Sequence, residues 1–416
     1  MQLSNIIFWT VILIFILEFL LERVLSILNQ KSWSAELPEQ FKEIYNQKKY
    51  QEAMDYSKAN SKIGMISSSF SFIVILLALF LGWFSSLDGL VNSWVENPIL
   101  RALLFFGFLG LFSSIISLPF SVYSTFVIEE RFGFNKTNVK TFVLDLLKGG
   151  LISIIFGALI LSLIVFLYLK LGANFWWAAW LVVAGFMLFM TMFYSNIIVP
   201  LFNKQTPLEE GLLREAISRF SEKVGFKLDN IYVIDGSKRS TKANAYFTGL
   251  GAKKRIVLYD TLINDHTTEE LVAVLAHEIG HYKKKHTRTG LILGLIQTAV
   301  MFYLLSLFIA PDGQVAVSAA EAIGAEPSFQ IGVLVFGVLF TPISTILGIF
   351  MNMLSRKNEY EADAFARDNY SGEKLSEALI KMSVKHLSNL SPHPAYVFVN
   401  YSHPPLMARL NAMKCK

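Results

Sequence analysis

Residues 150–199 read GLISIIFGALILSLIVFLYLKLGANFWWAAWLVVAGFMLFMTMFYSNIIV and contain one charged residue, Lys170. The stretch holds two apolar runs, each close to the roughly 20 residues with which a helix crosses a hydrocarbon core about 30 Å thick. Only Gly172 and Ala173 separate these runs. The stretch therefore predicts a hairpin of two membrane-spanning helices.

The rest of the 416-residue chain has the same character. Hydrophobic residues make up 53% of it and charged residues 17%, against about 25% charged residues in a typical soluble domain. This composition excludes an ordinary soluble protein and a disordered chain, and it predicts a mainly α-helical, polytopic membrane protein with seven transmembrane helices. The seven stretches of sufficient length are 6–28, 63–87, 99–122, 150–171, 174–199, 289–310 and 329–354.

Lysine and arginine are concentrated in alternate connections between these stretches. Segments 31–62 and 123–149 carry six and four of them, whereas segments 88–98 and 311–328 carry none. Because cytoplasmic loops retain positive charge, we predict that the N-terminus faces outward and that the C-terminus lies in the cytoplasm. The net charge of +5 follows from this topology, so no nucleic-acid partner is expected.

The spans divide the chain into four parts. Residues 1–200 hold five transmembrane helices with their cytoplasmic loops, and residues 201–288 have a soluble composition. Residues 289–354 hold the last two spans, and residues 355–416 form a cytoplasmic C-terminal segment. We expect the second and fourth parts to form one divided cytoplasmic domain.

Local patterns predict the elements of the segment 201–288. Apolar residues at helical spacing predict a helix over 207–224. Residues 230–234 read as a β-strand, and residues 243–259 read as a small β-hairpin whose strands, 245–248 and 255–259, flank Gly249 and Gly251.

A capping box from Thr267 to Glu270 predicts the start of a helix that continues through His281. This helix reads Leu271-Val-Ala-Val-Leu-Ala-His277-Glu278-Ile-Gly-His281. Two histidines four residues apart share a helical face, so both imidazoles can bind one zinc ion. Glu278 is rotated away from these ligands and can take a proton from a water molecule that the ion activates. Because Cys415 is the only cysteine, an all-cysteine zinc site and an internal disulfide are excluded.

A catalytic zinc ion needs a third protein ligand, and an acidic cluster follows the last span. At helical spacing, Glu359 and Asp363 share a face, whereas Glu361 points about 200° away from Glu359. Glu359 can then bind zinc, and Asp363 can orient a ligand histidine or an arginine from behind. The alternative is a solvated acidic face where a membrane helix ends.

Together these motifs resemble the CAAX prenyl protease 1 family of integral-membrane zinc metallopeptidases. The resemblance covers most of the chain and includes four further stretches: Glu130-Arg-Phe-Gly-Phe-Asn135-Lys-Thr137, Pro200-Leu-Phe-Asn203, Asn244-Ala-Tyr-Phe-Thr-Gly249 and His403-Pro-Pro-x-x-x-Arg409. It implies a gluzincin-like metallopeptidase domain with one zinc ion per chain and Glu359 as the third ligand. It also implies a barrel of seven helices that encloses a large water-filled chamber.

The resemblance gives roles to the C-terminal motif as well. His403 would assist the substrate carbonyl or the oxyanion, and Arg409 would support the site through Asp363. Without the family, His403 reads as an ordinary turn histidine before two prolines.

Three further positions are interpreted from the residues themselves. Asn244 and Ala245 begin an extended edge next to the zinc helix, where a substrate peptide could bind by strand addition. An ordinary hairpin asparagine is the alternative at residue 244. His286 and the preceding lysines are interpreted as anchors at the cytoplasmic membrane boundary.

We therefore expect a membrane-embedded zinc metalloendopeptidase. Its substrate would be a peptide or protein, with a C-terminal prenylated Cys-a-a-X sequence cut after the modified cysteine, as the resemblance implies. The expected place is the inner membrane of a bacterium, in contact with lipid, with the active site on the cytoplasmic side. The sequence gives no signal for the oligomeric state.

Two alternatives remain at this point. One is a zinc protease that degrades misfolded membrane proteins, and the other is a zinc-stabilised membrane scaffold or lipid-binding chamber without catalysis. Glu278 distinguishes the enzymes from the scaffold, because a purely structural zinc site needs no base.

Overall fold

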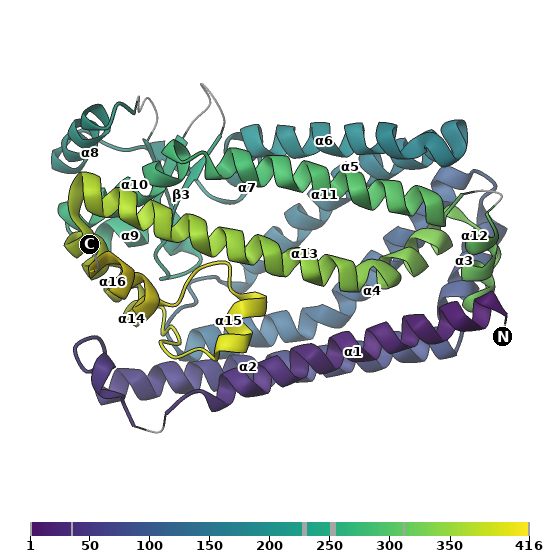
Figure 1. Ribbon diagram of the computed structural model, residues 1–416, viewed down its shortest axis with the longest axis horizontal. Helices are drawn as coiled ribbons and strands as arrows, with labels where there is room; N and C mark the ends of the chain where they lie inside the picture. Colours follow the sequence, from purple (N-terminus) through teal and green to yellow (C-terminus); the bar gives the residue numbers. More distant parts are fainter. Residues whose placement is uncertain (1, 35, 227–230, 250–254, 311–312, 415–416) are drawn as a thin grey trace.

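The computed structural model describes residues 2–34, 36–226, 231–249, 255–310 and 313–414. Asn230, Gly251 and Cys415 lie outside these ranges. The chain is mainly helical and elongated, and its two termini lie at opposite ends of the long axis (Figure 1). The helices are α1 (Leu3–Lys31), α2 (Gln47–Phe80), α3 (Trp83–Trp94), α4 (Pro98–Tyr123), α5 (Val139–Leu171), α6 (Phe175–Phe193), α7 (Val199–Phe202), α8 (Leu212–Lys223), α9 (Asp260–Asp265), α10 (Thr268–Lys283), α11 (His286–Phe308), α12 (Gln314–Ala322), α13 (Phe329–Ala366), α14 (Gly372–Lys385), α15 (Pro394–Asn400) and α16 (Leu406–Lys414).

Several of these helices have the length and composition of membrane spans. Within the described ranges, five helical segments meet that criterion: Gln47–Phe80, Pro98–Glu129, Val139–Phe202, His286–Phe308 and Phe329–Lys385. The finding confirms a polytopic helical membrane protein, whereas the number of seven spans stays a prediction.

The segment Val139–Phe202 contains the predicted helical hairpin. A short 3₁₀ turn, Gly172–Asn174, separates α5 from α6. Gly172 has a φ of +54°, a conformation that glycine adopts without the steric penalty of a Cβ atom. The two helices pack against each other along the membrane region.

One predicted span, 63–87, is wrong at its C-terminal end. In the structure α2 ends at Phe80, and a new helix, α3, begins at Trp83. Gly82 has a φ of +65° between them, and this left-handed residue turns the chain out of the line of α2. Apolar composition continues through the turn, so hydropathy did not reveal it.

Helix α13 connects the two ends of the molecule. It runs from the end that holds α12 to the end that holds α10 and α16 (Figure 1). Its 38 residues correspond to about 57 Å at the rise of an α-helix. The apolar part ends near Leu354, so the last turns carry Glu359 and Asp363 into the end that holds α10 and α16 without a break.

The predicted β-hairpin is confirmed, and it belongs to a larger sheet. The strands are β1 (Gln205–Pro207), β2 (Ile231–Ile234), β3 (Ala245–Thr248) and β4 (Arg255–Tyr259), in the order β1-β2-β4-β3. Strands β3 and β4 are antiparallel, with Ala245 opposite Leu258, whereas β2 runs parallel to β4. Strand β3 lies at the edge of the described sheet. A β-strand that ends at Ile234 was predicted, but its place beside β4 was not.

Helix α10 is largely buried at the end of the molecule that also holds α14 and α16. Its capping box is present: the Thr267 hydroxyl accepts a hydrogen bond from the Glu270 amide, and the Glu270 carboxylate accepts one from the Thr267 amide. Leu271, Leu275 and Ile279 are at most 2% exposed. The helix packs against α8, α13 and α14, and close packing on several sides holds its histidines in fixed positions.

The predicted helix over 207–224 is observed as α8, which begins later, at Leu212. The motif at residues 130–137 joins the membrane helices to the end of the molecule that holds α10. Asn135 donates from Nδ2 to Glu130 at 2.9 Å, and the Lys136 amide donates to the Arg239 carbonyl at 3.0 Å. Arg239 in turn forms two hydrogen bonds with Asp145, on α5, at 2.7 and 2.8 Å.

Candidate active site

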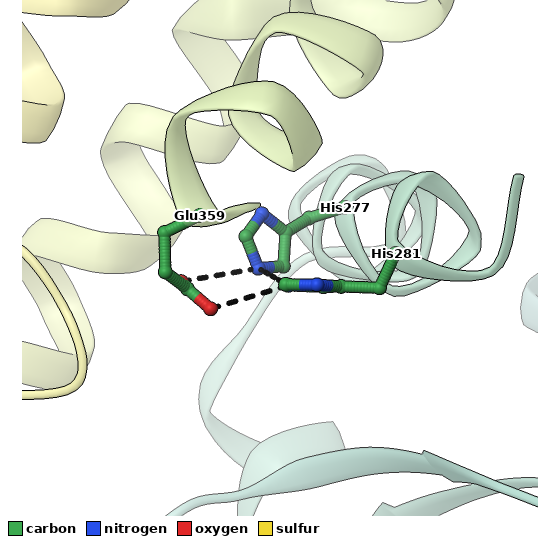
Figure 2. A group of neighbouring side chains, drawn as sticks. All are labelled: His277, His281 and Glu359. Atoms are coloured by element: carbon green, nitrogen blue, oxygen red, sulfur yellow. Dashed lines mark hydrogen bonds and ion pairs between the residues drawn. The ribbon is translucent and has the colours of Figure 1, made fainter. Parts of the chain in front are cut away.

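Two helices bring three potential metal ligands together. His277 and His281 are one turn apart on α10, and their Nε2 atoms lie 3.1 Å from each other. Glu359 reaches them from α13: its Oε2 lies 3.5 Å from His277 Nε2, and its Oε1 lies 3.2 Å from His281 Nε2. Figure 2 shows the three side chains converging on one point.

The geometry of this group fits a tetrahedral metal ion. Ligand atoms bonded to zinc at 2.0 to 2.1 Å lie about 3.3 Å apart. The two Nε2 atoms are 3.1 Å apart, and each lies 3.5 or 3.2 Å from one of the two Glu359 oxygens. Glu359 is 4% exposed, and its Oε2 has no hydrogen-bond partner among the described residues. Arg409 Nη1, 3.4 Å from this oxygen, supplies a positive charge but no hydrogen bond, and a metal ion held by the three side chains would supply a direct bond.

Asp363 lies behind His277, as its helical spacing predicts. Its Oδ1 is 2.9 Å from His277 Nδ1, and its two oxygens accept hydrogen bonds from Arg409 at 2.6 and 2.8 Å. A proton on Nδ1 leaves the Nε2 lone pair free for a metal ion. Arg409 also lies 3.4 Å from Glu359 through Nη1, so the structure brings Asp363 and Arg409 together, as the resemblance implied.

Electrostatics keep Asp363 ionised in this buried place. Burial by itself would raise the pKa of the Asp363 carboxyl, but hydrogen bonds from His277 and Arg409 lower this pKa to about 2. The carboxylate can therefore hold the His277 ring in one tautomer.

Glu278 borders a cavity next to the histidines. The cavity has a volume of about 340 Å³, and its lining includes Glu278, His281, Phe247 and Gly290. Burial raises the pKa of Glu278, a direction that favours a general base able to accept a proton near neutral pH.

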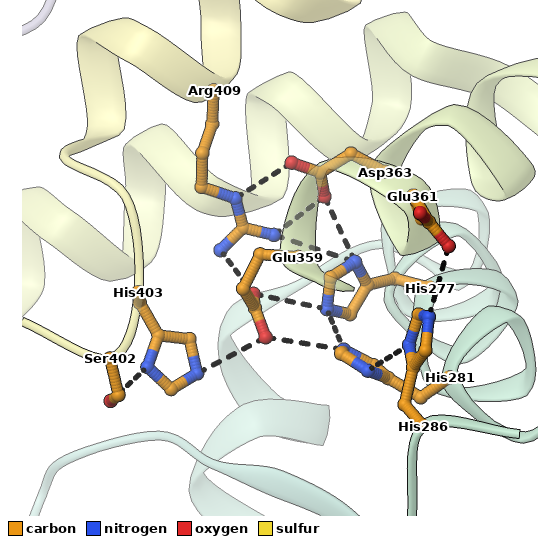
Figure 3. Close-up of polar contacts among 9 residues, drawn as sticks. All are labelled: His277, His281, His286, Glu359, Glu361, Asp363, Ser402, His403 and Arg409. Atoms are coloured by element: carbon orange, nitrogen blue, oxygen red, sulfur yellow. Dashed lines mark hydrogen bonds and ion pairs between the residues drawn. The ribbon is translucent and has the colours of Figure 1, made fainter. Parts of the chain in front are cut away.

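His403 lies at the rim of the group. Its Nε2 is 3.4 Å from Glu359 Oε1, its Nδ1 is 3.0 Å from the Ser402 hydroxyl, and its side chain is 65% exposed. The ring is thus near the metal-binding group and open to an incoming ligand (Figure 3).

Asn244 and Ala245 lie at the start of β3, which packs against α10. The Asn244 side chain folds back, and its Oδ1 accepts a hydrogen bond from the Ala245 amide at 2.9 Å. The edge of β3 is next to the histidine-bearing helix, but the Asn244 side chain caps its own strand in this conformation.

The interpretation of His286 as an interfacial anchor is wrong. The residue is 9% exposed, and its Nδ1 lies 3.0 Å from His281 Nδ1. Its Nε2 lies 3.2 Å from the Glu361 carboxylate. The sequence held one signal for the His281–His286 contact. A ligand histidine needs a hydrogen-bond partner for its second ring nitrogen, and His286 follows His281 by only five residues.

Comparison with known proteins places this arrangement in a family. A model described as the CAAX prenyl protease N-terminal region, with five membrane helices, matches residues 26–204, and the model of peptidase family M48 matches residues 207–415. CAAX prenyl protease 1 of Saccharomyces cerevisiae is 34% identical over 408 residues, which span 92% of this chain and 90% of that protein. The chain belongs to the CAAX prenyl protease 1 family.

Further relatives of this CAAX prenyl protease 1 family member agree over nearly the whole chain. The homolog of Arabidopsis thaliana is 36% identical over 388 residues, covering 91% of this chain and 90% of that protein. The crystal structure of S. mikatae Ste24p matches with a TM-score of 0.90 and 32% identity, and the match covers 99% of each chain. Family membership identifies a membrane metalloprotease and argues against a scaffold without catalysis.

Arg356 is a second site residue that sequence reasoning missed in this family member. It lies on α13, three residues before Glu359, and its guanidinium donates to the carbonyls of Val397, at 3.0 Å, and Tyr401. These carbonyls belong to the C-terminal end of α15, which leads directly to His403. The charge of Arg356 alone gave no signal, because its partners are backbone atoms about 40 residues away.

Proposed function

We propose that this chain hydrolyses peptide bonds with one zinc ion held by His277, His281 and Glu359. The observation that carries the proposal is the convergence of these ligand atoms, from two helices, beside a cavity that Glu278 borders. When bound, zinc supplies Lewis-acid polarisation of the substrate carbonyl and lowers the pKa of water to about 7.

Glu278 acts as the general base. It follows His277 directly on α10, so it is rotated by about 100° from that ligand, and it borders the cavity together with His281. The carboxylate accepts the proton of the attacking water and passes it to the departing amine.

Asp363 and Arg409 keep the ligand group in place. Asp363 orients His277 through Nδ1, and Arg409 balances the two buried carboxylates, Asp363 and Glu359. His403, at the exposed rim, donates a hydrogen bond to the oxygen on which negative charge develops.

The substrate backbone binds along β3. The strand forms the edge of the described sheet beside α10, and its outward amides and carbonyls from Ala245 onward can pair with an extended peptide. In this binding mode, Asn244 releases its own strand and donates to the peptide.

The substrate class follows the relatives, which carry the name CAAX prenyl protease 1. We propose that this chain cleaves a peptide or protein that ends in a prenylated Cys-a-a-X sequence, after the modified cysteine. Such a substrate reaches the site from the membrane, because a prenyl chain stays in the lipid.

The proposed topology has seven spans. The five segments of sufficient length include Val139–Phe202, which contains both α5 and α6, and α1 adds a helix of 29 residues. With the N-terminus outside, this count leaves the catalytic end in the cytoplasm, as the loop charges predict. A chamber enclosed by the helices, the four-part division at residues 200, 288 and 354, and a bacterial inner membrane belong to the same proposal.

The test is the substitution Glu278→Gln, with Glu269→Gln as the matched control on the exposed first turn of α10. Purified variants are given a quenched farnesylated peptide, and their zinc content is measured alongside. Removal of a general base is expected to slow hydrolysis by about 10²- to 10⁴-fold without loss of zinc, while the control keeps full activity. Wild-type rates in Glu278→Gln would refute the proposal.

A second measurement tests the substrate class. Peptides of one sequence, with and without the farnesyl group, are compared for kcat/KM, and the products are weighed by mass spectrometry. Preference for the lipidated peptide and one cut after the cysteine support the CAAX assignment. Equal rates would instead favour a protease that clears misfolded membrane proteins.

A further inference from the structure

The second ring nitrogen of His281 leads to a chain of hydrogen bonds. His281 Nε2 faces the other ligand atoms, and its Nδ1 lies 3.0 Å from His286 Nδ1. His286 Nε2 then lies 3.2 Å from Glu361 Oε2. Figure 3 shows His281, His286 and Glu361 in this order, leading from the ligand group to Glu361.

Only one arrangement of protons satisfies this chain when His281 binds a metal ion. Its Nε2 must then be unprotonated, so the ring proton is on Nδ1 and is donated to His286 Nδ1. His286 accepts that bond with its own lone pair and carries its proton on Nε2. This second proton is donated to the Glu361 carboxylate, which only accepts.

The backbone is shaped to bring His286 to this position. Lys285, between α10 and α11, has a φ of +62°, a left-handed conformation that is unfavourable for a residue with a side chain. The turn directs the first residue of α11 back towards α10. His286 is 9% exposed there, so the ring is enclosed by protein instead of facing the membrane boundary.

Helix α13, which supplies Glu359, also supplies a carboxylate for the second ring nitrogen of each ligand histidine. Asp363 contacts His277 directly at 2.9 Å, whereas Glu361 points to the other side of α13 and reaches His281 only through His286. Ligand histidines commonly donate their second nitrogen to a carboxylate, which fixes ring orientation and raises ligand basicity. Here one of the two carboxylates is connected by an intervening imidazole.

We propose that His286 and Glu361 form a relay that positions His281 for metal binding. They are positioning residues, since neither belongs to the ligand group. The inference rests on the proposed role of His277, His281 and Glu359 as metal ligands, and it adds a contribution to affinity that those ligands alone do not provide.

The test measures zinc affinity rather than turnover. Full-length variants in detergent are titrated with Zn²⁺ against a chelator of known affinity. His286→Phe keeps the ring shape without a hydrogen-bond acceptor, and we expect zinc binding about 10- to 100-fold weaker. His286→Gln can accept from His281 and donate to Glu361, so it is expected to recover most of the affinity.

Glu361→Leu provides an independent variant, because the Glu361 side chain is 37% exposed and its replacement leaves no buried cavity. Lys357→Met is its control, since Lys357 Nζ lies 3.8 Å from the opposite oxygen, Glu361 Oε1, and touches no histidine of the relay. Weaker zinc binding in Glu361→Leu but not in Lys357→Met supports the relay.

Wild-type affinity in a folded His286→Phe protein would overturn the inference, and so would wild-type affinity in Glu361→Leu if His286→Phe does not fold. Circular dichroism of the metal-free proteins decides whether they are folded. The outcome is separable from the proposed function, because Glu278→Gln tests hydrolysis while leaving the zinc affinity unchanged.

Discussion

Arg409 is the cation at the centre of the buried site, and its removal has a magnitude that the structure predicts. The residue is 8% exposed and donates to Asp363 at 2.6 and 2.8 Å, with Glu359 at 3.4 Å from Nη1. Arg409→Met keeps an unbranched apolar stem but leaves carboxylates that are 0% and 4% exposed without their cation. Removing one partner of a buried ion pair costs about 3 to 5 kcal/mol, so we expect a loss of that size in metal-free protein.

A double substitution tests whether the loss of stability in Arg409→Met comes from the broken ion pair with Asp363. Asp363→Asn removes one of the two unpaired charges and keeps the shape of the side chain. We expect Arg409→Met with Asp363→Asn to be less destabilised than Arg409→Met alone, with a coupling energy above about 1 kcal/mol. The stability assay is unfolding in mixed detergent micelles with increasing dodecyl sulfate, followed by tryptophan fluorescence in the presence of a zinc chelator.

The control for this cycle is Lys374→Met, which removes the exposed ion pair with Glu377. Exposed pairs contribute little, so only a small change is expected. Additive losses from Arg409→Met and Asp363→Asn, or a loss from Arg409→Met as small as that of the control, would contradict the reasoning.

Two further predictions concern pH and the cavity. Burial, with nearby lysines, lowers the pKa of His386 to about 4, and its Nε2 accepts a hydrogen bond from the Ala243 amide at 2.9 Å. Because a histidine in the unfolded chain titrates near 6.5, the free energy of unfolding should fall by up to about 3 kcal/mol as pH drops from about 6.5 to 4. Unfolding curves of His386→Gln should show a smaller fall over the same pH range. An added Cβ at Gly290 meets no atom within 4 Å, so Gly290→Leu should fold. Its side chain should fill the cavity beside Glu278 and lower kcat/KM about tenfold or more. Gly337→Leu, at an equally open position on α13, should fold and keep the wild-type kcat/KM.

Local sequence patterns predicted the elements that depend on neighbouring residues. The capping box at Thr267 fixed the start of α10, because its two hydrogen bonds join residues three apart. The spacing of His277 and His281 then placed both rings on one face. Strands β3 and β4 were predicted within their observed bounds for the same reason, since alternation and turn residues act over short distances.

Predictions failed where the partner is distant in the chain. Strand β1 is three residues long, too short for alternation to be visible, and it forms only because β2 lies beside it. Charge patterns missed Arg356, whose partners are backbone carbonyls. The break at Gly82 was missed because hydropathy averages over a window that spans the turn.

The sequence by itself determined that this is a helical membrane protein with one helix that carries two histidines on a shared face and a glutamate beside them, because lipid solvation and helical periodicity are properties of contiguous residues. Only the tertiary structure decided that Glu359 meets those histidines, that Arg409 closes on Asp363, and that His286 turns inward to link His281 with Glu361. Except for the His281–His286 pair, these contacts join residues at least 46 positions apart, and the packing of α10 against α13 sets their distances. Spacing along a chain does not encode that packing, because many side chains across the buried interface determine it together.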